Sequence, residues 1–179
     1  MKSLMLILGA ILLSSMEPMM IDFGKEKAGQ TWRILNDGVM GGRSASTIDY
    51  SEDHLRFAGT ISLENNGGFA SMRSPYGSMD LSEYKELRMR VRGDGSSFGM
   101  VLETSRTWFY PNYKVTFDAT EEWQELVFSL RDFDEYVVGR KQGKKMTDKN
   151  LQNVIRLGII TNDKAAKPFQ LDIDYIELK

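Results

Sequence analysis

Apolar and polar residues alternate along most of the chain from residue 21 onward. The clearest run is at residues 87–92, where three apolar residues alternate with three arginines. Residues 113–117 and 169–175 repeat this two-residue period. Because successive side chains of a strand point to opposite faces of a sheet, the period predicts β-strands that bury one face. Shorter runs of the same kind predict further strands at residues 45–50, 54–63, 69–74, 98–103, 123–129 and 154–161.

The run at residues 154–161 is almost entirely apolar, which predicts a central strand covered on both faces. Residues 63–74 taken alone predict a hairpin, and one helical turn is expected after Thr147, a good N-cap residue. Glycine-rich turns are predicted between strands at residues 66–68, 93–95 and 139–143. Many short strands with glycine-rich turns and no long helical period predict a single all-β domain, a sandwich or barrel, over residues 21–179.

Residues 1–20 have the pattern of a targeting segment. Lys2 precedes an uncharged apolar run at residues 4–13. The run is too short to span a bilayer but suits a signal peptide, with Ser15 as its last residue, or an uncleaved anchor that holds the protein near a membrane. Export, for example to the periplasm, is therefore expected. The alternative is a cytoplasmic protein whose translation starts at Met16, Met19 or Met20.

The composition excludes several classes of function. The net charge is −2 with both signs mixed along the chain, which argues against non-specific binding of nucleic acid. Cysteine is absent, so disulfides, thiolate nucleophiles and cysteine-ligated zinc are excluded. The one histidine, His54, excludes sites that need two imidazoles, and it is expected to be an ordinary turn or strand-end residue. No serine lies in a G-x-S-x-G turn. We therefore expect a protein that is not an enzyme.

The most unusual stretch of sequence is residues 32–44, which combines an aromatic residue, a turn with glycine at Gly38, a pair of glycines and an arginine. In one interpretation it is a tight loop across the end of the sandwich, with Trp32 buried in the core. In the other it is a binding loop. The candidate binding residues of this stretch are Trp32, Asn36, Asp37, Met40 and Arg43.

Arginines supply a second set of candidates. Arg88, Arg90 and Arg92 are expected on one face of one strand, either as a solvated face or as the charged floor of a concave sheet that contacts an anionic or hydroxylated ligand. Glu103 is the acidic partner expected from the next strand. Arg73 and Arg90 are predicted to neighbour acidic groups within this floor.

Aromatic residues and carboxylates complete the list of candidates. At least one of Trp108, Phe109 and Tyr110 must be exposed, and exposed aromatic faces stack on sugar rings or anchor protein interfaces. Trp108 and Tyr110 are therefore candidate binding residues. No cofactor is expected, although calcium is a weak possibility because hard cations bind carboxylate oxygens. The weak calcium candidates are Asp22, Asp172 and Asp174.

Several runs together resemble a known family. They are residues 36–44 with Trp32 before them, residues 57–59, 64–73, 84–95 and 169–176. In this order they resemble the complex I intermediate-associated protein 30 family, and the leader is that of a bacterial, single-domain member. The resemblance implies a jelly-roll β-sandwich of the galactose-binding type. Eukaryotic members assist the assembly of respiratory complex I in mitochondria.

Two functions follow from the residues and the resemblance. The first is a non-catalytic binding module that engages a protein partner, in a chaperone or assembly role. The alternative is a carbohydrate-binding module of an exported protein.

Overall fold

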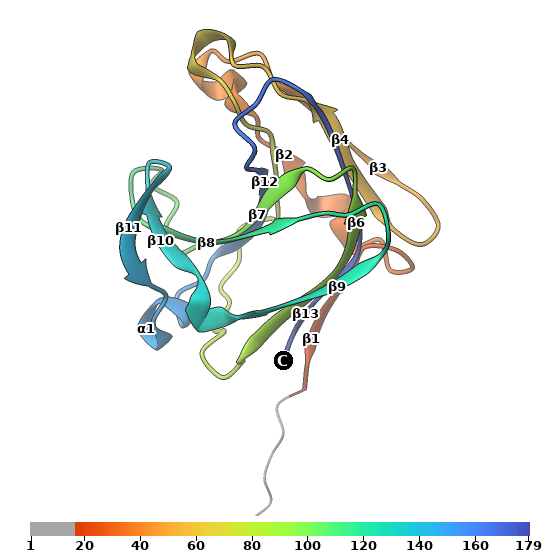
Figure 1. Ribbon diagram of the computed structural model, residues 1–179. Helices are drawn as coiled ribbons and strands as arrows, with labels where there is room; N and C mark the ends of the chain where they lie inside the picture. The colour runs from red at the N-terminus through yellow and green to blue at the C-terminus, as the bar shows by residue number, and fades with distance from the viewer. Residues whose placement is uncertain (1–16) are drawn as a thin grey trace, which may run out of the picture.

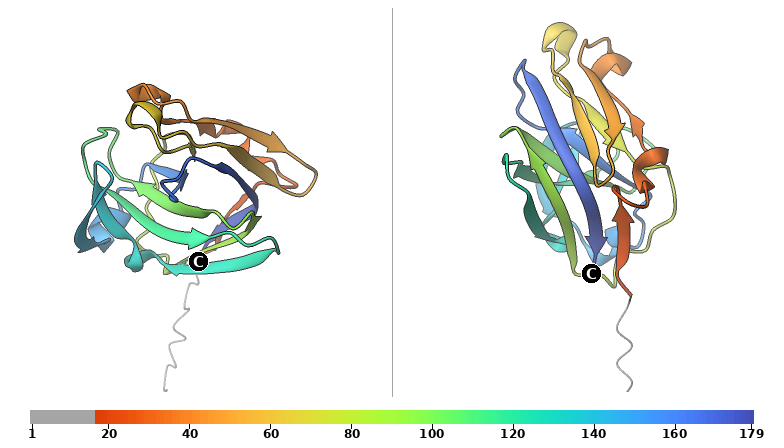
Figure 2. Two further views of the ribbon diagram at one scale, coloured as in Figure 1. Left: turned by 45° about the horizontal axis from the view of Figure 1, so that its top comes forward. Right: turned by 90° about the vertical axis from the view of Figure 1, so that its right-hand side faces the viewer.

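The computed structural model describes residues 17–179 and forms a sandwich of two antiparallel sheets (Figure 1). The six-stranded sheet contains β1 (Met19–Asp22), β3 (Ala45–Tyr50), β4 (Leu55–Thr60), β6 (Glu86–Gly93), β9 (Gln124–Ser129) and β13 (Pro168–Leu178). Its order is β3-β4-β13-β6-β9, and β1 pairs with the far end of β13. Figure 2 shows the long strand β13 running beside β6.

The seven-stranded sheet has the order β11-β10-β8-β7-β12-β5-β2. Its strands are β2 (Arg33–Ile34), β5 (Ser71–Arg73), β7 (Ser97–Glu103), β8 (Asn112–Asp118), β10 (Asp134–Val137), β11 (Arg140–Lys145) and β12 (Arg156–Thr161). The helical turns are η1 (Ala28–Thr31), η2 (Asp37–Met40), η3 (Glu64–Asn66), η4 (Leu130–Asp132) and α1 (Asp148–Leu151). The jelly-roll β-sandwich predicted from the sequence is confirmed.

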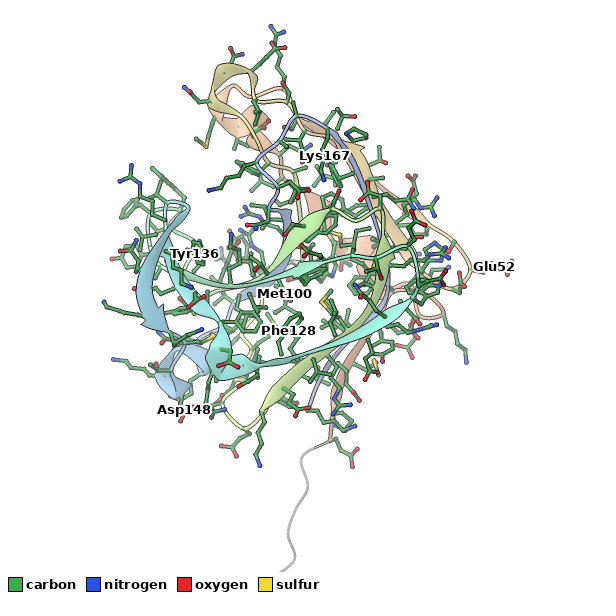
Figure 3. All side chains as sticks on the ribbon, in the orientation of Figure 1. Glu52, Met100, Phe128, Tyr136, Asp148 and Lys167 are labelled. Carbon is green, nitrogen blue, oxygen red and sulfur yellow. The ribbon has the colours of Figure 1, made fainter. Side chains whose placement is uncertain are left out.

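The core lies between the two sheets and follows the alternation of the sequence. On β6, Leu87, Met89 and Val91 are fully buried, and the arginines between them point outward, as predicted. Side chains such as Met100 and Phe128 fill the space between the sheets from opposite sides (Figure 3). Apolar area removed from water in this way is the main stabilising contribution to the fold.

Two predicted turns have a different role from the one expected. Residues 63–74 do not form a hairpin, because the segment after β4 crosses to β5 of the other sheet. The turn at residues 93–95 likewise leads from β6 in one sheet to β7 in the other. Glycine chemistry suits a hairpin and a crossover equally well. The prediction that residues 63–74 form a hairpin was therefore wrong, and so was the expectation that the strand after residues 93–95 lies beside β6.

Other local predictions have mixed outcomes. Thr147 caps α1 in a capping box with Asn150, as expected. Strand β12 is central, between β7 and β5, but only its inner face is covered by the core. The segment at residues 139–143 was predicted as a turn, and most of it belongs to β11, which is exposed along its whole length. In the loop at residues 36–44, Gly41 has a positive φ of 89° and ends η2.

The domain begins earlier than the predicted boundary at residue 21. Met19 and Met20 belong to β1 and pair with Leu178 and Glu177 of β13. The predicted leader falls mainly on residues 1–16, which lie outside the described residues. Within residues 17–179, no helix has the length and apolar character needed to cross a membrane.

Candidate functional site

A groove of about 590 Å³ lies on the outer face of the seven-stranded sheet. Strands β5, β12, β7, β8 and β10 supply its floor, and loops at residues 35–40, 105–111 and 138–139 line its sides. In Figure 1 the β10–β11 hairpin stands on the left and the loops around residues 40 and 65 stand at the top. This volume suits a small ligand or a short segment of a larger one.

The register of the sheet fixes which residues form the floor. Gly158 pairs with Arg73 on one side and Val101 on the other, and Val101 pairs with Lys114. These four residues therefore make one row across four adjacent strands. The row beside it contains Arg156, Glu103, Asn112 and Tyr136. The middle of the floor is open because Gly158 has no side chain, and a Cβ there would lie 3.3 Å from Arg73 Cγ.

Two arginines share one carboxylate at one end of the groove. Glu103 Oε1 accepts a hydrogen bond from Arg73 Nη1 at 2.9 Å, and Oε2 accepts from Arg156 Nη2 at 2.6 Å and from its Nε at 3.0 Å. The Glu103 side chain is only 11% exposed. Burial lowers the pKa of Arg73, and the Glu103 charge opposes that shift. The guanidinium of Arg156 also lies 4.2 Å from the ring centre of Tyr76, which Arg106 approaches to 4.6 Å.

Lys114 provides the cation of the other end. Its Nζ donates to Asn162 Oδ1 at 2.8 Å and lies 4.3 Å from the ring centre of Tyr136. The aliphatic part of the Lys114 side chain passes so close to Gly99 that a Cβ on Gly99 would lie 2.5 Å from Lys114 Cδ. Burial, together with the nearby charge of Lys164, lowers the pKa of Lys114. The ammonium group is thus held in place by a neutral amide and an aromatic face.

Exposed apolar side chains surround the charged floor. Trp108 is 75% exposed and Met40 is 69% exposed, and Tyr110 and Val138 are also more than half exposed. All four line the groove. The expectation that at least one aromatic residue at 108–110 is exposed is confirmed, since all three are. Such a rim offers apolar contact area to whatever enters the groove.

The wall that carries Met40 is built around the buried carboxylate of Asp37. This carboxylate accepts hydrogen bonds from Ser44 N at 2.9 Å, Ser44 Oγ at 2.5 Å, Gly68 N at 2.7 Å and Phe69 N at 3.2 Å. Burial raises its pKa, but these hydrogen bonds outweigh burial and leave the pKa below its ordinary value. Asp37 therefore joins the loop at residues 36–44 to the loop at residues 62–69.

Two glycines of these loops make room for the Asp37 carboxylate. A Cβ at Gly42 would overlap it, and a Cβ at Gly67 would lie 2.6 Å from its Oδ2. One glycine of each pair in this part of the sequence is therefore explained by the packing of one buried acid, and the other, Gly41 or Gly68, has positive φ.

Four of the predicted binding residues meet at the groove, namely Met40, Arg73, Trp108 and Tyr110. Trp32 and Asp37 do not offer a binding surface. Trp32 is 4% exposed and lies edge-on against Phe23, 5.2 Å between ring centres. It is a core residue, and its assignment as a binding residue was wrong. The Asn36 side chain accepts a hydrogen bond from Ser46 Oγ of β3.

The remaining arginine candidates lie away from the groove. Arg43 pairs with Glu64 at 2.8 Å on an exposed loop. Arg88 and Arg90 lie on the outer face of the six-stranded sheet, where they pair with Glu86 and Asp174. Arg73 and Arg90 both neighbour acidic groups, Glu103 and Asp174, as predicted. They lie on opposite outer faces of the sandwich, however, so they do not share one charged floor. Glu103 pairs with arginines of its own sheet instead.

The acids on the six-stranded sheet are bound by cations of the protein. Asp172 is fully buried and accepts from Arg56 at 2.7 Å and from Arg92 at 2.9 Å. His54, at the strand end as expected, lies 3.4 Å from it. Burial raises the pKa of Asp172, and the bonds from Arg56 and Arg92 outweigh burial and lower it. Trp123 lies beneath the guanidinium of Arg92, 4.8 Å from its ring centre.

Each of the three calcium candidates has its own partner within the protein. Asp22 accepts from Gly24 N at 2.8 Å, while Asp172 and Asp174 face arginines. Among residues 17–179, no three His, Asp or Glu side chains come together in a way that could hold a metal ion.

Sequence reasoning missed several residues of the groove. Lys114 and Tyr136 were not singled out, nor were Arg106 and Arg156. Lys114 occupies a polar position of the alternating run at residues 113–117, which places it on the outer face of a strand. Nothing local indicates which strands lie beside that one, so the grouping of these cations could not be read from the sequence.

Comparison with known proteins identifies the scaffold. The sequence model of the complex I intermediate-associated protein 30 family matches residues 21–173. The chain belongs to that family. The mouse mitochondrial protein named complex I intermediate-associated protein 30 is 29% identical over 171 residues, which is 81% of this chain and 51% of that protein. This chain thus spans about half the length of that relative.

Solved structures of carbohydrate-binding modules share the fold. The family 11 module of a cellulosomal cellulase from Clostridium thermocellum superimposes with a TM-score of 0.68 and 13% identity, covering 92% of this chain and 95% of the module. A family 29 module gives a TM-score of 0.55 at 10% identity, with 92% of each chain covered. Both of these solved structures are carbohydrate-binding modules by name.

Proposed function

We propose that this member of the complex I intermediate-associated protein 30 family is a non-catalytic binding module that holds a segment of a partner protein in the groove of the seven-stranded sheet. The observation that carries the proposal is the composition of the groove. Three arginines, three tyrosines and one tryptophan line it. Tryptophan, tyrosine and arginine are the residues that contribute most binding energy in protein interfaces.

The arrangement of the aromatic residues favours a protein over a glycan. Two guanidinium groups lie against the Tyr76 ring, and the Lys114 ammonium lies against the Tyr136 ring. Sugar rings stack on aromatic faces that are free, whereas the faces of Tyr76 and Tyr136 are partly covered by these cations. The apolar rim of Met40 and Val138 adds contacts that suit side chains of a protein. The mouse relative is named for association with an intermediate of complex I, which also supports a protein partner.

The test fills the groove without changing its charge. Gly158→Leu adds a side chain at the middle of the floor, where its Cβ would lie 3.3 Å from Arg73 Cγ and 3.4 Å from the backbone oxygen of Met72. Thr47→Leu adds the same side chain on the exposed face of β3, in the other sheet. Affinity purification from the native source should recover a partner with the natural protein and with Thr47→Leu, and lose it with Gly158→Leu. Equal recovery with all three proteins would remove the groove as the interface.

A carbohydrate ligand is the second candidate. It is favoured by the exposed faces of Trp108 and Tyr110 and by the fold shared with a family 11 module solved in complex with a mixed-linked β-1,3-1,4 tetrasaccharide, at a TM-score of 0.65. Calorimetry with that tetrasaccharide distinguishes the candidates. Binding that disappears in Trp108→Ala, with no protein partner recovered, would establish the glycan in place of the protein.

A further inference from the structure

The charge of the groove is opposite to the charge of the whole chain. Four cationic residues line it, Arg73, Arg106, Lys114 and Arg156, and the one carboxylate among the lining residues is that of Glu103. The chain as a whole has a net charge of −2. An electropositive groove on an acidic protein concentrates anionic ligands, because field lines are focused where low-dielectric walls exclude water.

The cations are incompletely neutralised. Arg73 and Arg156 share Glu103, so this group of three carries one net positive charge. Lys114 donates to a neutral amide, and the carboxylate of Asp134, its cross-strand neighbour on β10, pairs with Lys141 and Lys145. Removing a cation from water without a counter-charge is unfavourable. A carboxylate brought by a ligand would offset that cost at both ends of the groove.

The geometry of the row fits an extended chain that crosses the strands. Arg73 and Lys114 stand at the two ends of a row of four neighbouring strands, so their backbones lie roughly 14 Å apart. The Lys114 side chain leans inward over Gly99 of β7 toward Asn162, so its ammonium group lies within this span. Residues four apart in an extended peptide are separated by about 13 Å and point to the same side. Between the two cations, Gly158 and Val101 present no polar side chain and leave space above the sheet.

We propose that the groove recognises an acidic extended segment of a partner protein, in which two carboxylates four residues apart meet Lys114 at one end and the Arg73–Arg156 pair at the other. The proposal rests on the protein-binding function above and adds the chemistry of the partner. Apolar side chains of the same segment would contact the rim at Met40 and Trp108. Arginine pairs favour carboxylates because their planar donors match the two oxygens of the acid.

The experiment uses defined peptides with the complete protein. The probe is a labelled nine-residue serine–glycine peptide with leucine at its fifth position and glutamate at its third and seventh. One control peptide has glutamine at both positions, and a second has glutamates at the third and sixth, which point to opposite faces when extended. We expect the first peptide to bind roughly tenfold or more tightly than either control, and to weaken as salt is raised.

Matched variants locate the effect in the groove. Lys114→Gln removes one positive charge from the floor, and Lys149→Gln removes one from the exposed helix α1. Binding should fall roughly tenfold in Lys114→Gln and stay unchanged in Lys149→Gln. Circular dichroism and urea unfolding establish that both variants are folded. Equal peptide binding by the two variants would overturn the proposal.

The outcomes separate this proposal from the one on which it rests. Loss of the native partner with Gly158→Leu but not with Lys114→Gln would leave the groove as a protein interface and overturn its preference for acids. An oligogalacturonate that binds more tightly than the peptide and competes with it would assign the groove to an acidic glycan, which overturns the peptide. Binding of the neutral mixed-linked tetrasaccharide alone would overturn both proposals.

Discussion

Replacement of Asp37 tests whether one buried acid holds the wall of the groove in place. Its carboxylate accepts four hydrogen bonds from Ser44, Gly68 and Phe69, which belong to two loops. A hydrogen bond to a charged group contributes about 1.5–3 kcal/mol. The sum of these four hydrogen-bond contributions is an upper bound on the loss, because loops near the surface recover part of their hydration when the acid is removed. We expect Asp37→Ala to lower the free energy of unfolding by about 3–5 kcal/mol.

The pH dependence of stability provides an independent check. The folded-state pKa of Asp37 lies below its unfolded value of about 3.9. The stabilisation by this carboxylate is therefore complete above pH 4 or so and is lost as the pH falls through the folded-state pKa. The difference in stability between the natural protein and Asp37→Asn should consequently be largest near neutral pH and shrink in acid.

Urea unfolding followed by tryptophan fluorescence measures both effects, since buried Trp32 reports on the core. Asp49→Ala is the matched control, because Asp49 is an exposed acid whose side chain accepts from Thr47 alone. It should change stability by less than about 0.5 kcal/mol. If Asp37→Ala lowers the free energy of unfolding by less than about 1 kcal/mol, no more than the control does, then Asp37 does not hold the two loops of the wall together.

Three further predictions concern other parts of the molecule. Trp32→Ala should cost roughly 3–5 kcal/mol in urea unfolding, because its indole is buried, and a loss below about 1 kcal/mol would make it a surface residue. Glu103→Gln should cost about 3 kcal/mol, because it leaves two partly buried guanidinium groups without their shared counter-charge, and an unchanged midpoint would contradict this. Cleavage of an export signal after Ser15 would leave β1 complete, so N-terminal sequencing of the native protein should find Met16 as its first residue. A first residue at Met1 or Lys2 would contradict cleavage.

The strands that could be predicted are those whose own residues alternate. Strands β6, β8 and β13 each bury one face, so a two-residue period identifies them without any knowledge of their neighbours. Strand β11 has no buried residue, and β2 has only two residues. Neither leaves a pattern in the sequence, because their places in the sheet come from backbone pairing with β10 and β5.

The pairing of distant strands explains why the site was found only in part. Trp108 and Met40 were identifiable because apolar residues in polar loops have no core to enter. The sequence predicts Glu103 beside the arginines of residues 88–92, because a glycine-rich turn such as residues 93–95 usually joins neighbouring strands. In the structure that turn changes sheets. One misassigned connection thus moved Glu103 to the opposite face of the sandwich and hid its pairing with Arg73 and Arg156.

The family resemblance itself lies in the scaffold more than in the groove. The most specific run, residues 36–44, builds the wall through Asp37, whose carboxylate is buried and faces the loops instead of the groove. Of the cations of the floor, Arg73 lies within one of the runs that carry the resemblance, residues 64–73, whereas Lys114 and Arg156 lie outside those runs although within the family match at residues 21–173. The ligand proposed for this chain therefore rests on its own groove residues, whose cations match an acid.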